Sequence, residues 1–196
     1  MPNRRSQKVA SSPQTTVSTG CLRKALAKRT KAELVDVNME IASDDRGVQR
    51  RLESQFGLEL PPKELVAATR QAIADATDFD ERDVNRNFSY DYQAYDAVKR
   101  NLGRLIKEGH LRATMDLSLE LMSQGSYQVE MSDEGLMTDD IKECLQVVIK
   151  ALRKCDLSAD NVIAWCSEML QKDRVGFICD QELQALQDRF DTSRSS

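Results

Sequence analysis

Apolar residues recur at steps of three and four positions along most of this chain, and that spacing places them on one face of an α-helix. The pattern is clearest between residues 90 and 124. It predicts one helix that ends at Gly109 and a second that begins near His110. So short a turn predicts that the two helices are antiparallel. Their apolar faces would consist of Tyr92, Tyr95, Val98, Leu102, Leu105 and Ile106, followed by Leu111, Met115, Leu119 and Met122.

Similar signals predict helices on both sides of this pair. Thr30 and Glu33 form the Thr-x-x-Glu pattern of a capping box, so a helix of about three turns should follow and bury Leu34, Val37 and Ile41 or its neighbours. Other helices are predicted from about 44 to 57, from 62 to 76, from about Ile141, and after Ser158 and Asp180. Residues 21–29 can form a further short basic helix. The polar stretch from Asp78 to Asn87 is predicted to be a loop.

These elements predict an all-α protein, because Val, Ile and Thr nowhere alternate as they would in a sheet. We expect seven or eight helices of about 10–19 residues, paired as antiparallel hairpins in a stack like that of helical-repeat proteins. No strict internal repeat is visible, so an irregular compact bundle is the alternative. The predicted organisation is a basic, Ser/Thr-rich disordered arm over 1–20, a single helical domain over 21–192 and a disordered tail over 193–196.

The composition narrows the class of protein. Apolar residues make up 40% and charged residues 31%, which is too apolar for a disordered chain and too charged for a membrane protein. The N-terminus has charges but no apolar segment typical of a secretory signal. The five cysteines are an odd number without a paired spacing, so we expect them to be reduced, with most serving as small hydrophobic residues. A cytoplasmic protein fits these features.

Charge is unevenly distributed. Residues 1–32 contain eight Lys/Arg and no acid, whereas residues 33–196 contain 20 basic and 32 acidic residues, a balance of −12. The basic arm can neutralise phosphates, which makes a nucleic-acid-associated protein one alternative function. It lacks interleaved aromatic residues and any DNA-binding motif. Its candidate phosphate contacts are Arg4, Arg5, Lys8, Arg23 and Lys24.

Residues 125–140, GSYQVEMSDEGLMTDD, contain five acids and no basic residue. Carboxylates are suitable ligands for Ca²⁺ or Mg²⁺, but these acids come largely as adjacent pairs, which diverge. Thr138, Asp139 and Asp140 stand where the next helix begins, so their predicted role is to cap it and to interact with its dipole. The excess acid at Glu130, Asp133 and Glu134 is the predicted docking surface for a partner.

A second acidic segment, 171–182, has the glycine and the final glutamate of a calcium-binding EF-hand loop, at Gly176 and Glu182. Position one is Gln171 and position five is Val175, so Asp173 and Glu182 are the only carboxylates in the usual set. That is too few for useful affinity, and an ordinary connector between helices is predicted. No metal and no cofactor is expected.

The aromatic cluster at Phe88, Tyr90, Tyr92 and Tyr95 divides into two parts. Tyr92 and Tyr95 are predicted to lie in the core or at its rim. Phe88 and Tyr90 precede the helix and are candidate docking residues, because aromatic side chains are enriched in interface hot spots.

The segment from Tyr90 to Leu186, most distinctively IKEGHLRATMDLSLELM and the acidic stretch after it, resembles uncharacterised bacterial proteins. These in turn resemble the helical region that accompanies SWIM zinc fingers. The likeness covers about residues 31–190 and implies a helical-repeat fold and an interaction module. The Cys-x-Cys and Cys-x-His pairs of the finger itself are missing, so the resemblance implies no zinc and no activity tied to it.

Motifs for catalysis are missing as well: the chain has no G-x-S-x-G, no glycine-rich phosphate loop and no H-E-x-x-H, and His110 has no motif partner. No catalytic residue is predicted. We therefore expect a non-catalytic module or adaptor that binds another protein. The alternatives are the nucleic-acid-associated protein and a small enzyme with an unrecognised acidic site.

Overall fold

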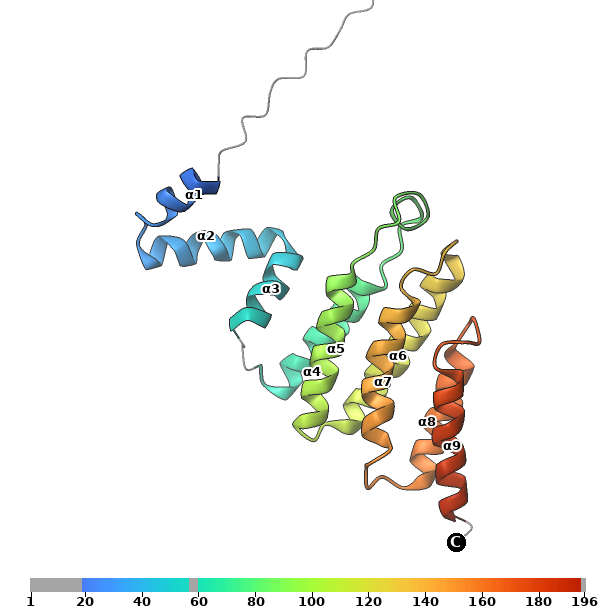
Figure 1. Ribbon diagram of the computed structural model, residues 1–196. Coiled ribbons are helices and arrows are strands. Elements are labelled where there is room, and N and C mark those ends of the chain that lie inside the picture. The colour runs from blue at the N-terminus through green and yellow to red at the C-terminus, as the bar shows by residue number, and fades with distance from the viewer. Residues whose placement is uncertain (1–18, 57–59, 195–196) are drawn as a thin grey trace, which may run out of the picture. The chain divides into compact units, whose positions relative to one another are not determined.

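The computed structural model describes residues 19–56 and 60–194, and all the regular secondary structure in them is helical, as predicted (Figure 1). It divides into two compact units, Met1–Arg46 and Gly47–Ser196. This boundary falls inside the segment 21–192 for which the sequence predicted one domain. Nine α-helices and one π-helical turn occur in the described residues, which is more than the seven or eight helices expected.

The first unit contains α1 (Thr19–Leu26) and α2 (Lys31–Asp44). The capping box is confirmed: Thr30 Oγ1 accepts from the Glu33 N–H at 3.3 Å, and Glu33 Oε2 accepts from the Thr30 N–H at 2.8 Å. The predicted burial is wrong for Val37, which is 47% exposed; Ile41 is equally exposed, but its neighbour Ala42 is buried, as the prediction allowed. A piece of chain this short cannot enclose a core of its own.

The second unit is a stack of three helical hairpins. α4 (Pro62–Ala76) pairs with α5 (Tyr92–Lys107), α6 (Leu111–Met131) with α7 (Thr138–Leu152), and α8 (Ala159–Lys172) with α9 (Asp180–Arg194). The first helices of the hairpins contact one another in one layer, α4 to α6 and α6 to α8. The second helices form the other layer, α5 to α7 and α7 to α9 (Figure 1). The predicted stack of antiparallel hairpins is therefore confirmed.

The apolar stripes of these hairpins form one core. Tyr95, Val98, Leu102 and Leu105 are at most 1% exposed, as their spacing predicted. Tyr92, the first residue of α5, is an exception at 57% exposed. Cys144, Cys166 and Cys179 are buried with the core, and burial raises the pKa of each thiol to about 12.

Helix α6 is longer than predicted and takes in residues 125–131, the first part of the acidic stretch. Gly125 lies inside the helix and is buried. A Cβ at this position would come within 2.9 Å of Ile141 Cδ1, so α6 and α7 approach closely here. Gly125 is therefore a packing position between two helices.

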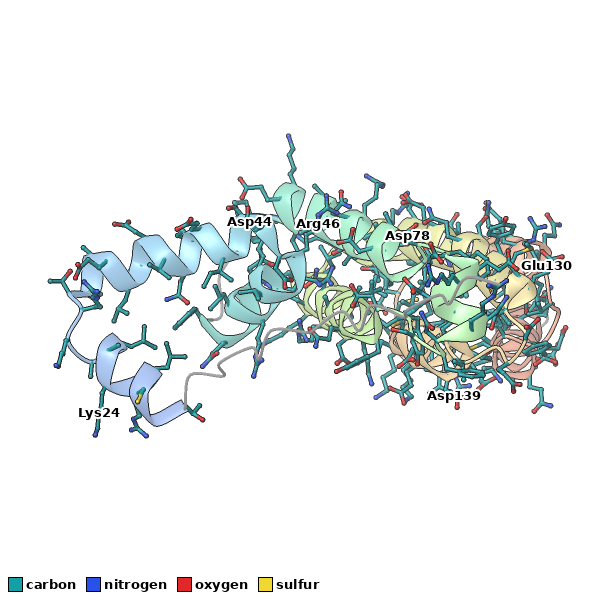
Figure 2. The ribbon with its side chains drawn as sticks, turned by 90° about the horizontal axis from the view of Figure 1, so that it is seen from above. Lys24, Asp44, Arg46, Asp78, Glu130 and Asp139 are labelled. Carbon is teal, nitrogen blue, oxygen red and sulfur yellow. The ribbon has the colours of Figure 1, made fainter. Side chains whose placement is uncertain are left out.

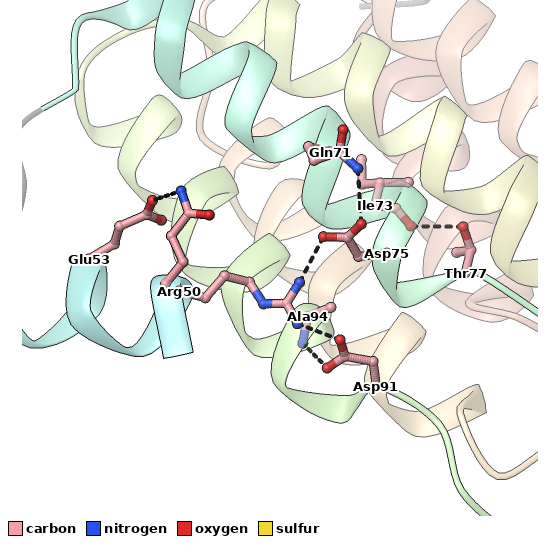
Figure 3. A network of polar contacts seen from close by, with 9 residues as sticks. Arg50, Glu53, Gln71, Ile73, Asp75, Thr77, Asp91 and Ala94 are labelled. Atoms are coloured by element: carbon pink, nitrogen blue, oxygen red, sulfur yellow. Dashed lines mark hydrogen bonds and ion pairs between the residues drawn. The ribbon is translucent and has the colours of Figure 1, made fainter. Parts of the chain in front are cut away.

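One arginine of helix α3 (Arg46–Phe56) forms ion pairs with two aspartates of the hairpin stack. Arg50 donates from Nη1 to Asp75 Oδ2 at 2.8 Å and from Nη2 to Asp91 Oδ2 (Figure 3). Its Nε is buried and has no hydrogen-bond partner among the described residues. Since Asp91 also accepts from the Ala94 N–H as the N-cap of α5, one carboxylate both starts α5 and anchors α3.

None of the helices in the described residues has the length and apolar character required to cross a membrane.

Candidate protein-docking surface

The hairpin stack has two edges where its helices turn. We call one of them the long-loop edge. It contains the connection between the two helices of each hairpin, together with the adjoining helix ends, and consists of residues 77–92, 127–142 and 172–180. We call the residues 60–64, 107–111 and 152–159, where hairpins begin or connect, the short-loop edge. In Figure 1 the long-loop edge is the upper end of the stack, and α9 runs from it to the lower end.

Exposed apolar side chains of the stack gather at one of these edges. Among residues 60–194, the large apolar side chains that are more than a third exposed all belong to the long-loop edge. The short-loop edge contributes none of them. Scattered exposed apolar residues are ordinary on a protein surface, but their restriction to one edge is typical of an interaction site. The six residues are Phe88, Tyr92, Tyr127, Met131, Leu136 and Phe177.

Phe88 is held in an unfavourable conformation as well as being exposed. Its φ is +52°, in the left-handed region that aromatic residues seldom adopt, and its side chain is 61% exposed. The other non-glycine residue with positive φ in the described part of the chain is Cys179, which precedes α9 on the same edge. Such conformations cost about 1–3 kcal/mol and are concentrated at functional sites.

The segment before Phe88 is not the loop that the sequence predicted. It contains the π-helical turn η1 (Arg82–Arg86), in which the Asn87 N–H donates to Arg82 O at 3.1 Å. Asp80 begins the turn, because its Oδ1 accepts from the Arg82 and Asp83 N–H groups at 2.8 and 3.0 Å. An aspartate cap and a buried Val84 together give order to a stretch that appears uniformly polar in sequence.

Asn85 joins η1 to the acidic stretch. Its Nδ2 donates to Met131 O at 3.2 Å, and its Oδ1 accepts from the Asp133 N–H at 3.0 Å. The two groups predicted separately as docking residues, Phe88 with Tyr90 and Glu130 with Asp133 and Glu134, therefore lie on the same edge. The fold brings them together across more than 40 positions of sequence.

Tyr90 is part of the support for this edge and is only partly exposed. Its hydroxyl donates to Asp140 Oδ2 at 2.6 Å, and its ring packs edge-on against Tyr95. Burial, followed by the bond to Asp140, raises the pKa of Tyr90. Asp139 and Asp140 do occupy the first turn of α7, as predicted. The predicted side-chain cap is wrong, because Met137 is the N-cap residue and Thr138 Oγ1 donates to Gly135 O at 2.6 Å.

A buried pair supports the same edge from inside. The Tyr95 hydroxyl donates to Gln128 Oε1 at 2.6 Å. Gln128 Nε2 in turn donates to the carbonyls of Ala76 and Asp78 at 3.1 and 3.2 Å. α5 and α6 thus hold the point where α4 ends and residues 77–91 begin.

The connector between α8 and α9 is organised by Asp173. This side chain is 8% exposed; its Oδ1 accepts from the N–H groups of Val175 and Gly176, and its Oδ2 from Ile178 at 2.7 Å. These bonds occupy the oxygens that an EF-hand would direct at calcium, and they present Phe177 to solvent. In the described residues, no three His, Cys, Asp or Glu side chains are placed to hold a metal ion.

Two aromatic rings of the edge have cations over them. Arg174 lies 5.0 Å from the ring centre of Tyr127 and also pairs with Glu130. Lys142 Nζ lies 5.9 Å from the ring centre of Phe177. Glu130 is therefore already paired. Asp133 and Glu134 are exposed, and no basic side chain of the described residues pairs with them.

Figure 2 looks onto this edge from above, where Asp78, Glu130 and Asp139 lie at separate positions around it. The edge contains twelve acids and five Lys/Arg in its three segments. The short-loop edge contains three acids and four Lys/Arg. Acid excess and exposed aromatic side chains therefore coincide on one edge of the molecule.

The candidate phosphate contacts are only partly covered by the structure. Arg23 and Lys24 are exposed on α1, while Arg4, Arg5 and Lys8 lie outside the described residues. Sequence reasoning missed Tyr127, Met131, Leu136 and Phe177 on the long-loop edge. Helical periodicity does not separate these exposed residues from core residues. It shows which residues lie on the same face of a helix, but it does not show which end of the stack they occupy.

A scan against family models found no match, and comparisons with curated proteins and with solved structures found none either. The resemblance to the helical region that accompanies SWIM zinc fingers stays a prediction.

Proposed function

We propose that this chain is a non-catalytic helical module that binds another protein through its long-loop edge. The observation that carries the proposal is Phe88, an aromatic residue that is 61% exposed on a backbone with φ of +52°. A residue that served stability alone would be buried or would be a glycine at this position. Strain combined with exposure favours a role outside the fold, and aromatic side chains are typical anchors of interfaces.

Rigid support strengthens this proposal. Asn85, Tyr90 and Asp173 fix the three connecting segments with side-chain hydrogen bonds to backbone groups. A surface held in one geometry loses little conformational entropy on binding, so its exposed apolar area contributes more to affinity. The edge therefore combines apolar anchors, polar groups around them and a preorganised backbone.

Site-directed photo-crosslinking in the source cells tests the docking edge. The photoreactive residue p-benzoylphenylalanine would replace Phe88 or Phe177 on the long-loop edge, and Lys107 or Lys154 on the short-loop edge as matched controls. All four positions are exposed. We expect discrete protein adducts from positions 88 and 177 and none from 107 and 154. Adducts from both edges in equal yield would overturn the proposal.

Adducts made of nucleic acid would favour the alternative function. Salt-sensitive retention on DNA or RNA that depends on Arg23 and Lys24 is the corresponding measurement, because phosphate contacts weaken steeply with ionic strength.

A further inference from the structure

We infer that the partner presents a basic segment, rich in Lys or Arg and carrying apolar side chains, to the long-loop edge. This inference rests on the proposed function and adds the chemistry of the partner. It follows from three features of the edge: its charge, which includes two unpaired carboxylates, the use that the protein already makes of its aromatic rings, and its exposed apolar side chains.

The first feature is the negative charge of the long-loop edge. The acidic excess of the long-loop edge is concentrated in 130–140, which contains five acids and no basic residue. Glu130 is paired with Arg174, and Asp140 accepts from Tyr90. Asp133 and Glu134 remain exposed without a basic partner in the described residues, and their carboxylates are directed at no backbone group of those residues. Complementary charge on a partner would steer its approach to this point.

The aromatic rings supply the second feature. Tyr127 and Phe177 each have a cation over the ring, supplied by Arg174 and Lys142 respectively. Rings on this edge thus already serve as acceptors for guanidinium and ammonium groups. Phe88 and Tyr92 are more exposed than either of these rings, at 61% and 57%. A Lys or Arg of a partner can stack on them, a contact worth about 0.5–2 kcal/mol depending on desolvation.

The apolar part of the surface supplies the third feature. Met131 and Leu136 are 45% and 38% exposed, and Leu136 lies two residues after Glu134. A purely basic and flexible chain would leave these side chains in water. A segment that alternates apolar and basic residues covers them while its charges meet Asp133 and Glu134. An acidic or nucleic-acid partner would meet like charge here.

Fluorescence anisotropy with the purified full chain tests the inference. The probe is a fluorescein-labelled helical peptide of leucine and lysine, and the matched control peptide has glutamate in place of each lysine. We expect the lysine peptide to bind and the glutamate peptide not to bind. Raising the salt concentration should weaken binding, because exposed charges are screened.

Charge-reversal variants locate the binding. Asp133→Lys combined with Glu134→Lys should lower the affinity for the lysine peptide by about tenfold, which corresponds to about 1.4 kcal/mol. The matched control is Glu64→Lys combined with Asp156→Lys, which reverses one Glu and one Asp on the short-loop edge and changes the net charge equally. The control should change the affinity by less than about twofold. Equal weakening by both pairs, or binding of the glutamate peptide as well, would overturn the inference.

Failure of this inference is distinguishable from failure of the proposed function. If crosslinks form at positions 88 and 177 but the lysine peptide does not bind, the docking edge stands and the basic partner is wrong. If the peptide binds while crosslinks form equally at 107 and 154, the docking edge itself is wrong.

Discussion

The two edges of the hairpin stack do the same structural task in different ways. On the short-loop edge, residues 108–110 turn the chain from α5 to α6, with Gly109 at φ +85° and a His110 N–H bond to Leu105 O at 2.8 Å closing α5. The long-loop edge uses a π-helical turn, an aspartate-centred connector and two non-glycine residues with positive φ. A turn between helices needs none of these devices. The contrast agrees with the docking function proposed above, and three matched pairs of substitutions together with the single substitution Tyr95→Phe test it.

The largest expected effect concerns the connectors themselves. Asp173→Ala removes the acceptor of three backbone N–H groups from a nearly buried site, so we expect a loss of about 2–4 kcal/mol in the free energy of unfolding. Ser158→Ala is the matched change on the short-loop edge, where the N-cap side chain makes no capping bond, and it should cost about 0.5 kcal/mol or less. Urea unfolding measures both. Equal losses would mean that the two connectors are built alike.

The next effect concerns how closely the helices approach. Gly125→Ala would place a Cβ at 2.9 Å from Ile141 Cδ1, and overpacking of this kind costs about 1–3 kcal/mol. Gly103→Ala in α5 meets only Val147 Cγ1 at 3.9 Å, an ordinary contact, and should be neutral or stabilising by up to about 1 kcal/mol. Thermal unfolding of both variants checks the contrast. A stabilised Gly125→Ala would show that α7 shifts without cost.

A smaller effect is expected from inside the long-loop edge. Tyr95→Phe removes the hydroxyl that donates to Gln128 Oε1 and leaves a buried acceptor unpaired, at a cost of about 1–2 kcal/mol. Because Gln128 also holds Ala76 O and Asp78 O, amide hydrogen exchange should rise in 77–91 and stay unchanged in 107–111. A uniform rise across both edges would contradict local support.

The smallest expected change in stability is at Phe88, where a substitution should affect binding but not folding. Phe88→Gly relieves a left-handed backbone and exposes little core, so the free energy of unfolding should stay constant or rise by up to about 1 kcal/mol. Gly109→Ala on the short-loop edge should lower it by about 1 kcal/mol, since its φ is +85° and no atom crowds it. The Phe88 variant should nevertheless no longer bind the lysine peptide. A variant that is both less stable and fully able to bind would overturn the role of Phe88.

Local rules determined much of the fold in advance. The capping box at Thr30 and Glu33, the glycine stop at Gly109 and the buried stripe from Tyr95 to Leu105 all depend on residues within a few positions of one another. Such signals act through the backbone and through the helical period, so the sequence carries them directly. The all-α class and the antiparallel hairpins follow from them.

The candidate surface was predicted in parts. Phe88, Asp133 and Glu134 were identified from residue type, because aromatic anchors and excess acid are visible in any sequence. The continuation of α6 past Gly125 was not predicted, because glycine disfavours a helix and its close contact with Ile141 is visible only in the structure. The order in 80–87 was also missed, because it depends on Asn85 bonding across to Met131 and Asp133.

Local patterns therefore define most of the helices, their order and the inventory of acidic and aromatic residues. Packing of the hairpins places Phe88, Leu136 and Phe177 on one edge, because hairpins of similar length stack in register and align connectors that are distant in sequence. Packing also determines which acids remain available to a partner, because Asp173 accepts hydrogen bonds from backbone N–H groups and Glu130 forms an ion pair with Arg174. Pairing of charges depends on distances in space, and those arise only when the layers pack.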